Sequence, residues 1–172
     1  SLDDCFAMIE NKLEEKGLAD DTIVVYTSDH GDLLRYVNGR RQYKTRPEPT
    51  SCQVPLLVRY PQRLRPRASD LVVGTLDLMP TLLGMMNLPV PAVCQGLDLS
   101  GAIGREDDDA ATETPLLTIM GGPGWRGVAT REHVYSTFFG LHAKPYPVGF
   151  DILADRIRDP YVLNNRFGER SA

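Results

Sequence analysis

The feature that most constrains the fold is a short run of apolar and β-branched residues that ends abruptly in polar ones. Residues 22–28 read Thr-Ile-Val-Val-Tyr-Thr-Ser, and Asp29-His30-Gly31-Asp32 follows directly. Such continuous hydrophobicity predicts a buried strand of a parallel sheet. Ligands of open α/β sheets bind at the carboxyl ends of strands, so a carboxylate and an imidazole here suit metal or anion chemistry. A polar turn leaving the core fits the same residues.

Two helices and a second strand are predicted around this run. Leu2, Phe6, Ile9 and Leu13 recur at steps of four, three and four, which indicates a helix over 2–16 whose apolar stripe packs on the sheet. Ser1 with Asp4 has the character of a capping box, and Gly17 supplies the stop. Residues 54–59 are again continuously apolar and predict a second parallel strand. Residues 75–86 show helical spacing, with Pro80 expected to kink the helix or to begin a new one.

The pattern changes after an acidic stretch at 101–114, which reads as a solvated connector. Short strand candidates then alternate with Gly/Pro turns, as in an antiparallel meander. These candidates are 116–120, 125–130, 133–139 and 149–153. Asp159-Pro160 predicts the start of a short helix over 160–166. We therefore expect an α/β portion over 1–100 and a small antiparallel subdomain with a terminal helix over 115–172.

Composition narrows the possible partners. The 172 residues carry a net charge of −4, which argues against general affinity for nucleic acid. No apolar run approaches the ~20 residues that a membrane helix needs. The three cysteines form neither a disulfide framework nor a Cys-x-x-Cys metal pair. The hydrophobic fraction of 42% is that of an ordinary globular protein.

The segment 33–53 reads as an irregular loop with a local excess of positive charge. Its basic residues are Arg35, Arg40, Arg41, Lys44 and Arg46, against the single acid Glu48. Such a loop is typical of a rim that holds an anion, because charge-assisted hydrogen bonds suit anionic groups. A solvated loop is the alternative interpretation, and for the arginines it is the simpler one.

Several motifs in order resemble those of the sulfatase family, within the alkaline-phosphatase-like superfamily. The motifs are Ser28-Asp-His-Gly31, Lys44, Val54-Pro-Leu56, Thr75-Leu-Asp-Leu-Met-Pro-Thr-Leu-Leu83, Trp125-Arg-Gly-Val128 and Asp159-Pro-Tyr-Val-Leu-Asn-Asn165. The resemblance covers nearly the whole chain. It implies an α/β fold with flanking helices, followed by a small C-terminal antiparallel subdomain, and a hydrolase of sulfate esters.

The resemblance also implies roles for individual residues. Asp29 and His30 fall where the family holds one Ca²⁺ or Mg²⁺ ion, and hard cations prefer oxygen ligands such as Asp29. Lys44 falls at the place of the family's sulfate-contacting lysine, with a catalytic role. Arg46 lies beside it as a further substrate-binding candidate. Asn38 stands nearest to where the family often has the histidine of a His-Gly pair, a departure that bears on the substrate pocket.

The family's nucleophile is absent from this sequence. Sulfatases make a formylglycine from the first residue of a Cys/Ser-x-Pro-x-Arg motif, and Cys5, Cys52 and Cys94 do not begin one. The family's N-terminal Asp-Asp pair of metal ligands is absent too. We expect a portion of a sulfatase, with half a metal site, that needs the missing N-terminal part and is inactive alone. Two alternatives remain open: a phosphoesterase or phosphonate hydrolase of the same superfamily, and a non-catalytic binding or structural module.

Overall fold

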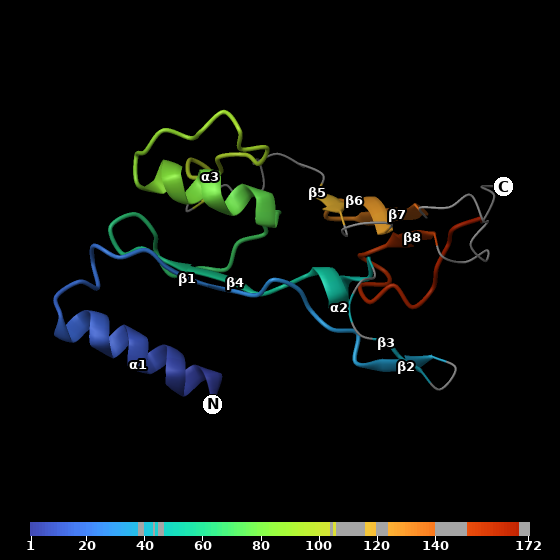
Figure 1. Ribbon diagram of the computed structural model, residues 1–172, viewed down its shortest axis with the longest axis horizontal. Coiled ribbons are helices and arrows are strands. Elements are labelled where there is room, and N and C mark those ends of the chain that lie inside the picture. Colours follow the sequence, from blue (N-terminus) through green and yellow to red (C-terminus); the bar gives the residue numbers. More distant parts are fainter. Residues whose placement is uncertain are drawn as a thin grey trace.

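The computed structural model describes residues 1–37, 40–42, 44, 47–103, 105, 116–119, 124–139 and 151–168. Its elements, in chain order, are α1 (Leu2–Glu15), β1 (Val24–Thr27), β2 (Arg35–Val37), β3 (Arg40–Gln42), α2 (Pro49–Cys52), β4 (Leu56–Arg59), α3 (Thr75–Met85), β5 (Leu116–Ile119), β6 (Gly124–Ala129), β7 (His133–Phe139) and β8 (Ile152–Asp155) (Figure 1). Among the described residues, no helix is both long and apolar enough to cross a bilayer.

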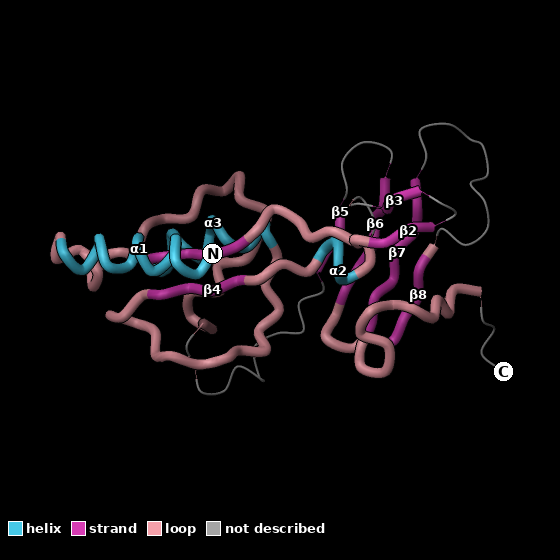
Figure 2. The backbone as a smooth tube through the Cα atoms, turned by 90° about the horizontal axis from the view of Figure 1, so that it is seen from below, coloured by secondary structure: helices cyan, strands magenta, loops and turns pink. Residues whose placement is uncertain are grey.

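The α/β portion has three layers, with the β1–β4 ribbon between α1 and α3 (Figures 1 and 2). Helix α1 begins with the predicted capping box, in which Ser1 and Asp4 bond each other's backbone N–H groups. Gly17, at φ 65°, ends the helical path. Phe6 packs edge-on against Tyr26 of β1, with ring centroids 6.0 Å apart. Tyr26 therefore ties the inner face of α1 to the ribbon.

Strands β1 and β4 pair antiparallel, with Val25 opposite Val58, so the predicted parallel pairing is wrong. A parallel pair needs a crossover that carries the chain back to the starting end of the sheet, usually through a helix. In its described residues the connection contains a hairpin and the one-turn helix α2, and the chain re-enters the sheet at the end where it left. Continuous hydrophobicity carries no information on strand direction. The predicted burial is not found in this chain either: no residue of β1 or β4 is fully buried, and Leu57 is 58% exposed. Both strands do lie in one sheet between two helices, as predicted.

The loop predicted over 33–53 contains regular structure. β2 and β3 form an antiparallel hairpin in which Tyr36 lies opposite Arg41. Helix α2 follows and lies between the β1–β4 ribbon and the C-terminal sheet (Figures 1 and 2). Pro49 occupies its first turn, where the missing N–H costs nothing. These short elements bring the basic segment close to the end of β1.

Helix α3 runs through Pro80 without a break and is joined to the segment after it by one buried carboxylate. Asp77, only 8% exposed, accepts hydrogen bonds from the N–H of Gly74 and from the N–H of Leu97, both at 2.8 Å. The first bond caps the helix, and the second fixes the returning chain. Asp77 thus satisfies two backbone donors that would otherwise be buried without partners.

The C-terminal strands form the predicted antiparallel meander, in the order β5-β6-β7-β8. Their buried core comprises Val134, Ile152, Ala154 and Val162. The helix predicted over 160–166 is absent, and this described segment forms turns instead. Asp159 accepts from the N–H groups of residues 163 and 164, as an N-cap would, but Val162 adopts φ 55°, which ends a helical path at once.

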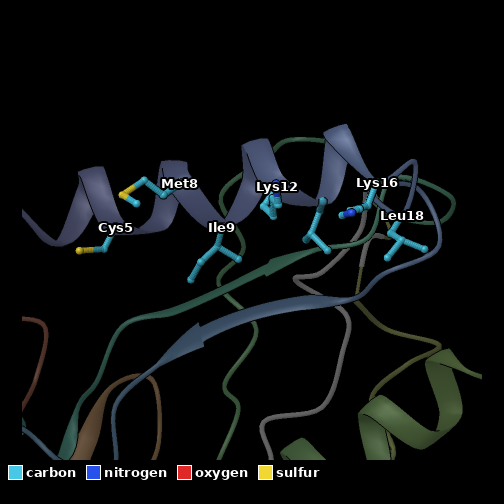
Figure 3. Close-up of a pocket in the computed structure, with 7 residues that line it drawn as sticks. Cys5, Met8, Ile9, Lys12, Lys16 and Leu18 are labelled. Atoms are coloured by element: carbon cyan, nitrogen blue, oxygen red, sulfur yellow. The ribbon is translucent and has the colours of Figure 1, made fainter.

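An open groove of about 630 Å³ runs along α1 (Figure 3). Its lining residues are Cys5, Met8, Ile9, Lys12, Leu13, Lys16 and Leu18. Ile9 is 56% exposed, although the apolar stripe to which it belongs was predicted to pack on the sheet, and Met8 beside that stripe is 70% exposed. Within the described residues, Phe6 and Leu13 alone among the stripe are partly buried.

Candidate functional site

The polar residues that follow β1 are held in a tight turn by local hydrogen bonds. The hydroxyl of Ser28 donates to the carbonyl oxygen of His30 at 2.9 Å. The N–H of His30 donates to Oδ1 of Asp29 at 3.0 Å. The Asp29 side chain is 83% exposed, and that of His30 is 35% exposed. The strand end therefore presents a solvent-accessible carboxylate beside a partly covered imidazole.

Gly31 joins this turn to α2 by a close backbone approach. Its N–H donates to the carbonyl oxygen of Ser51 at 2.8 Å. A Cβ placed on Gly31 would overlap the carbonyl oxygen of Thr50, well inside the 3.0 Å that real Cβ atoms keep. Glycine is required here because the backbone of α2 occupies the space of a side chain.

The imidazole of His30 has a partner on each ring nitrogen. Its Nδ1 lies 2.8 Å from the carbonyl oxygen of Gly31, and its Nε2 lies 2.7 Å from Nζ of Lys44. A carbonyl oxygen can only accept and an ammonium can only donate, so these partners select the neutral tautomer with the proton on Nδ1. The Nε2 lone pair then faces the ammonium. Oδ2 of Asp29 also approaches Nε2, at 3.4 Å.

The structure thus brings together three of the predicted site residues, Asp29, His30 and Lys44, although Lys44 is fourteen positions from His30. The other two predicted site residues, Asn38 and Arg46, lie outside the described residues. Lys44 itself is exposed. An anion that approached this turn would meet an ammonium group at the carboxyl end of β1.

A buried polar layer under the turn was missed by the sequence reasoning. Glu48 is 3% exposed, and Ser51 is 1% exposed with no hydrogen-bond partner for its Oγ among the described residues. Burial, and then the carboxylate of Glu48, raise the pKa of the Cys52 thiol to about 11. Pro49 at a helix start was the signal that could have predicted α2 and hence this packing.

The residues at the turn fit part of a cation site. Asp29 offers a hard oxygen and His30 offers one nitrogen lone pair, donors that divalent ions accept. The ammonium of Lys44 already contacts that lone pair, which shows that the position accepts positive charge. Within the described ranges, no group of three or more His, Cys, Asp or Glu side chains is placed to hold a metal ion. Calcium takes six to eight ligands, so these two residues supply a minority of a complete shell.

The family model for sulfatases matches residues 1–88, and the chain belongs to the sulfatase family. It is 28% identical to an endo-4-O-sulfatase of Bacteroides thetaiotaomicron over 180 residues, a match that covers 95% of this chain and 35% of the relative. It is 27% identical to an ulvan-active sulfatase of Formosa agariphila, covering 97% of this chain and 33% of that protein.

A solved structure shows the same fold. The protein, BT33494S-sulf, comes from work on glycosaminoglycan metabolism by Bacteroides thetaiotaomicron; it superposes with a TM-score of 0.80 at 28% identity. The match covers 95% of this chain and 36% of the solved one. The architecture is therefore that of an alkaline-phosphatase-like α/β fold with a small antiparallel subdomain. The chain spans about a third of the length of the relatives that it matches.

Proposed function

We propose that this chain acts as part of a metal-dependent sulfatase that hydrolyses sulfate esters. It would contribute Asp29 and His30 to the site of one Ca²⁺ or Mg²⁺ ion, and Lys44 as the group that contacts the sulfate. The observation that carries the proposal is the convergence of these three side chains at the end of β1, in a chain of the sulfatase family.

The charges at the turn suit a sulfate ester. A bound divalent ion supplies Lewis acidity, which neutralises charge on the ester oxygens. Lys44 adds a positive charge that is compact and mobile, and such a charge stabilises negative charge that grows during sulfuryl transfer. Asn38 and Arg46 are proposed as further substrate contacts on the same basic segment. Arg46 could bind a sulfate oxygen pair bidentately.

The proposed reaction needs groups that these residues do not supply. No Cys/Ser-x-Pro-x-Arg motif occurs in the sequence, so the formylglycine nucleophile and the remaining metal ligands must come from another portion of a sulfatase domain. The matched relatives are about three times as long as the matched region, which is the support for such a portion. Residues 1–100 would form the site-bearing part, 101–114 a connector, and 115–172 the C-terminal subdomain.

The surface that this portion would cover is the α1 groove together with the open edges of the β1–β4 ribbon. In the described part of the chain each of these strands has one neighbour, so each leaves one row of backbone groups unpaired. A ribbon of two four-residue strands is not stable by itself in water. Further strands beside the ribbon would pair its edges and bury the apolar side chains of α1.

Docking can be tested by adding the N-terminal two thirds of the endo-4-O-sulfatase relative to the purified chain. We expect a one-to-one complex in sedimentation, weakened by Met8→Glu in the groove and unaffected by Asn11→Glu on the exposed face of the same helix. Self-association through the groove, or equal effects of the two substitutions, would contradict this assignment.

Activity can be tested in a chimera in which this chain replaces the matched segment of the same relative. We expect sulfate release that is lost in Asp29→Ala and Lys44→Ala, with thermal unfolding used to show that each chimera folds. A folded chimera that cleaves phosphonate esters and leaves sulfate esters intact would refute the proposed function. Equal activity in both variants would refute the roles given to the two residues.

A further inference from the structure

The imidazole of His30 is oriented by the backbone and has a single nitrogen left for other partners. Nδ1 is engaged by the Gly31 carbonyl at 2.8 Å, and Gly31 is itself bound to Ser51 and packed against Thr50. The ring therefore cannot exchange its two nitrogens without losing its bond to the Gly31 carbonyl, and the contacts of Gly31 with α2 hold that residue in place. Any further partner of His30 must use the Nε2 lone pair.

That lone pair is already engaged by Lys44. Nζ lies 2.7 Å from Nε2, and the ammonium has no lone pair of its own, so it must donate to the imidazole. A divalent ion on His30 would need the same electron pair. The ion and the ammonium would also carry like charges within a few ångströms of each other. One imidazole nitrogen cannot serve both.

We propose that Lys44 and the divalent cation exchange on His30. Without the ion, the ammonium of Lys44 occupies Nε2 and keeps the turn in its binding geometry. When the ion binds to Asp29 and His30, Lys44 is displaced and its ammonium becomes available to an anion. The inference rests on the ligand roles in the proposed function, and it adds that the cation and the lysine compete.

The chemistry of Lys44 allows such an exchange. The side chain is exposed and its charge sits on a flexible four-carbon stem, so displacement needs no movement of the backbone. Because binding couplings are reciprocal, an anion that captures the released ammonium must also tighten the cation. In the completed site the cation and inorganic sulfate would therefore bind cooperatively, without turnover.

The test is cation binding by the chimera described above, in which the rest of the relative would supply the remaining metal ligands, measured by terbium luminescence with calcium as the competitor. Lys44→Met removes the ammonium and keeps the length of the side chain. We expect it to tighten calcium binding about fivefold or more, the lower end of ordinary coupling. Lys16→Met on α1 makes the same change in net charge at a distance and should leave binding within twofold. Sulfate should tighten calcium binding in the wild type and not in Lys44→Met.

The outcomes distinguish a failure of the exchange from a failure of the cation role in the proposed function. If binding requires Asp29 but Lys44→Met binds no tighter than Lys16→Met, the cation site stands and the exchange is refuted. If no variant shows binding that Asp29→Ala abolishes, the cation role in the proposed function fails and the exchange fails with it. Tighter binding in Lys44→Met that disappears in a His30→Ala background would support the exchange on Nε2.

Discussion

Substituting Gly31 by alanine should separate the site turn from α2. The new Cβ would overlap the Thr50 carbonyl oxygen, and it would lie 3.0 Å from the carbonyl carbon of Thr50 and 3.4 Å from the Ser51 oxygen. These are backbone atoms, so no side-chain rotation can relieve the overlap. The turn and α2 must move apart, which also breaks the 2.8 Å hydrogen bond from Gly31 to Ser51.

The free-energy cost of Gly31→Ala has two parts, the overpacking by the new methyl group and the lost hydrogen bond. Overpacking of one methyl group costs about 1–3 kcal/mol, and the lost backbone hydrogen bond costs about 1 kcal/mol. Local opening of α2 should therefore become easier by about 2–4 kcal/mol. At the lower figure the population of the open form rises about thirtyfold.

Cys52 reports this opening because it is the last residue of α2. Its thiol has a pKa raised to about 11 from an ordinary 9.0 by burial and by Glu48, so the closed form holds about a hundredfold less thiolate than an open one. In a Cys5→Ser, Cys94→Ser background, thiol labelling at pH 8 should be about thirtyfold faster with Gly31→Ala.

Gly101→Ala is the matched control, since a Cβ at Gly101 meets nothing within 4 Å. It should label at the wild-type rate and leave the free energy of unfolding within about 0.5 kcal/mol. If Gly31→Ala labels within twofold of this control, the close approach of the turn to α2 is wrong, and so is the argument that α2 orients His30.

Three other predictions follow from the same structure. Asp77→Ala should lower the free energy of unfolding in urea by about 2–4 kcal/mol, because the N–H groups of Gly74 and Leu97 lose their acceptor; a loss below 0.5 kcal/mol would contradict this. Cys52 stabilises the fold as a neutral thiol, so its contribution should be complete below pH 9 and decline as pH rises toward 11, a trend that Cys52→Ala should abolish. The purified chain with calcium should show no turnover of an aryl sulfate, and metal-dependent turnover would reveal a nucleophile among these residues.

The sequence was sufficient to predict the features that depend on neighbouring residues. Helical spacing and a capping box predicted α1, and Gly17 predicted its end. Alternating strands and turns predicted the C-terminal meander. The position of Asp29 and His30 just after β1 followed from the abrupt end of an apolar run. Periodicity and turn chemistry act over a few residues, so a single segment contains the information.

Interactions between distant segments were decided by the tertiary structure. The antiparallel pairing of β1 with β4 depends on the path of the connection between them, which the hydrophobicity of the strands does not encode. The turns that replace the terminal helix depend on the left-handed conformation of Val162, whose side chain is buried in the C-terminal core.

In the candidate site, too, the sequence determines some features and the tertiary structure determines others. The sequence indicates Asp29, His30 and Lys44 separately, through a resemblance to known motifs. Only the folded chain shows that Lys44 reaches Nε2 of His30 and that Gly31 binds Ser51 of α2. These contacts join residues fourteen and twenty positions apart, and they form only when the hairpin and α2 fold back on the end of β1. Local propensities therefore determined which groups lie at the strand end, and packing determined which atoms of those groups meet.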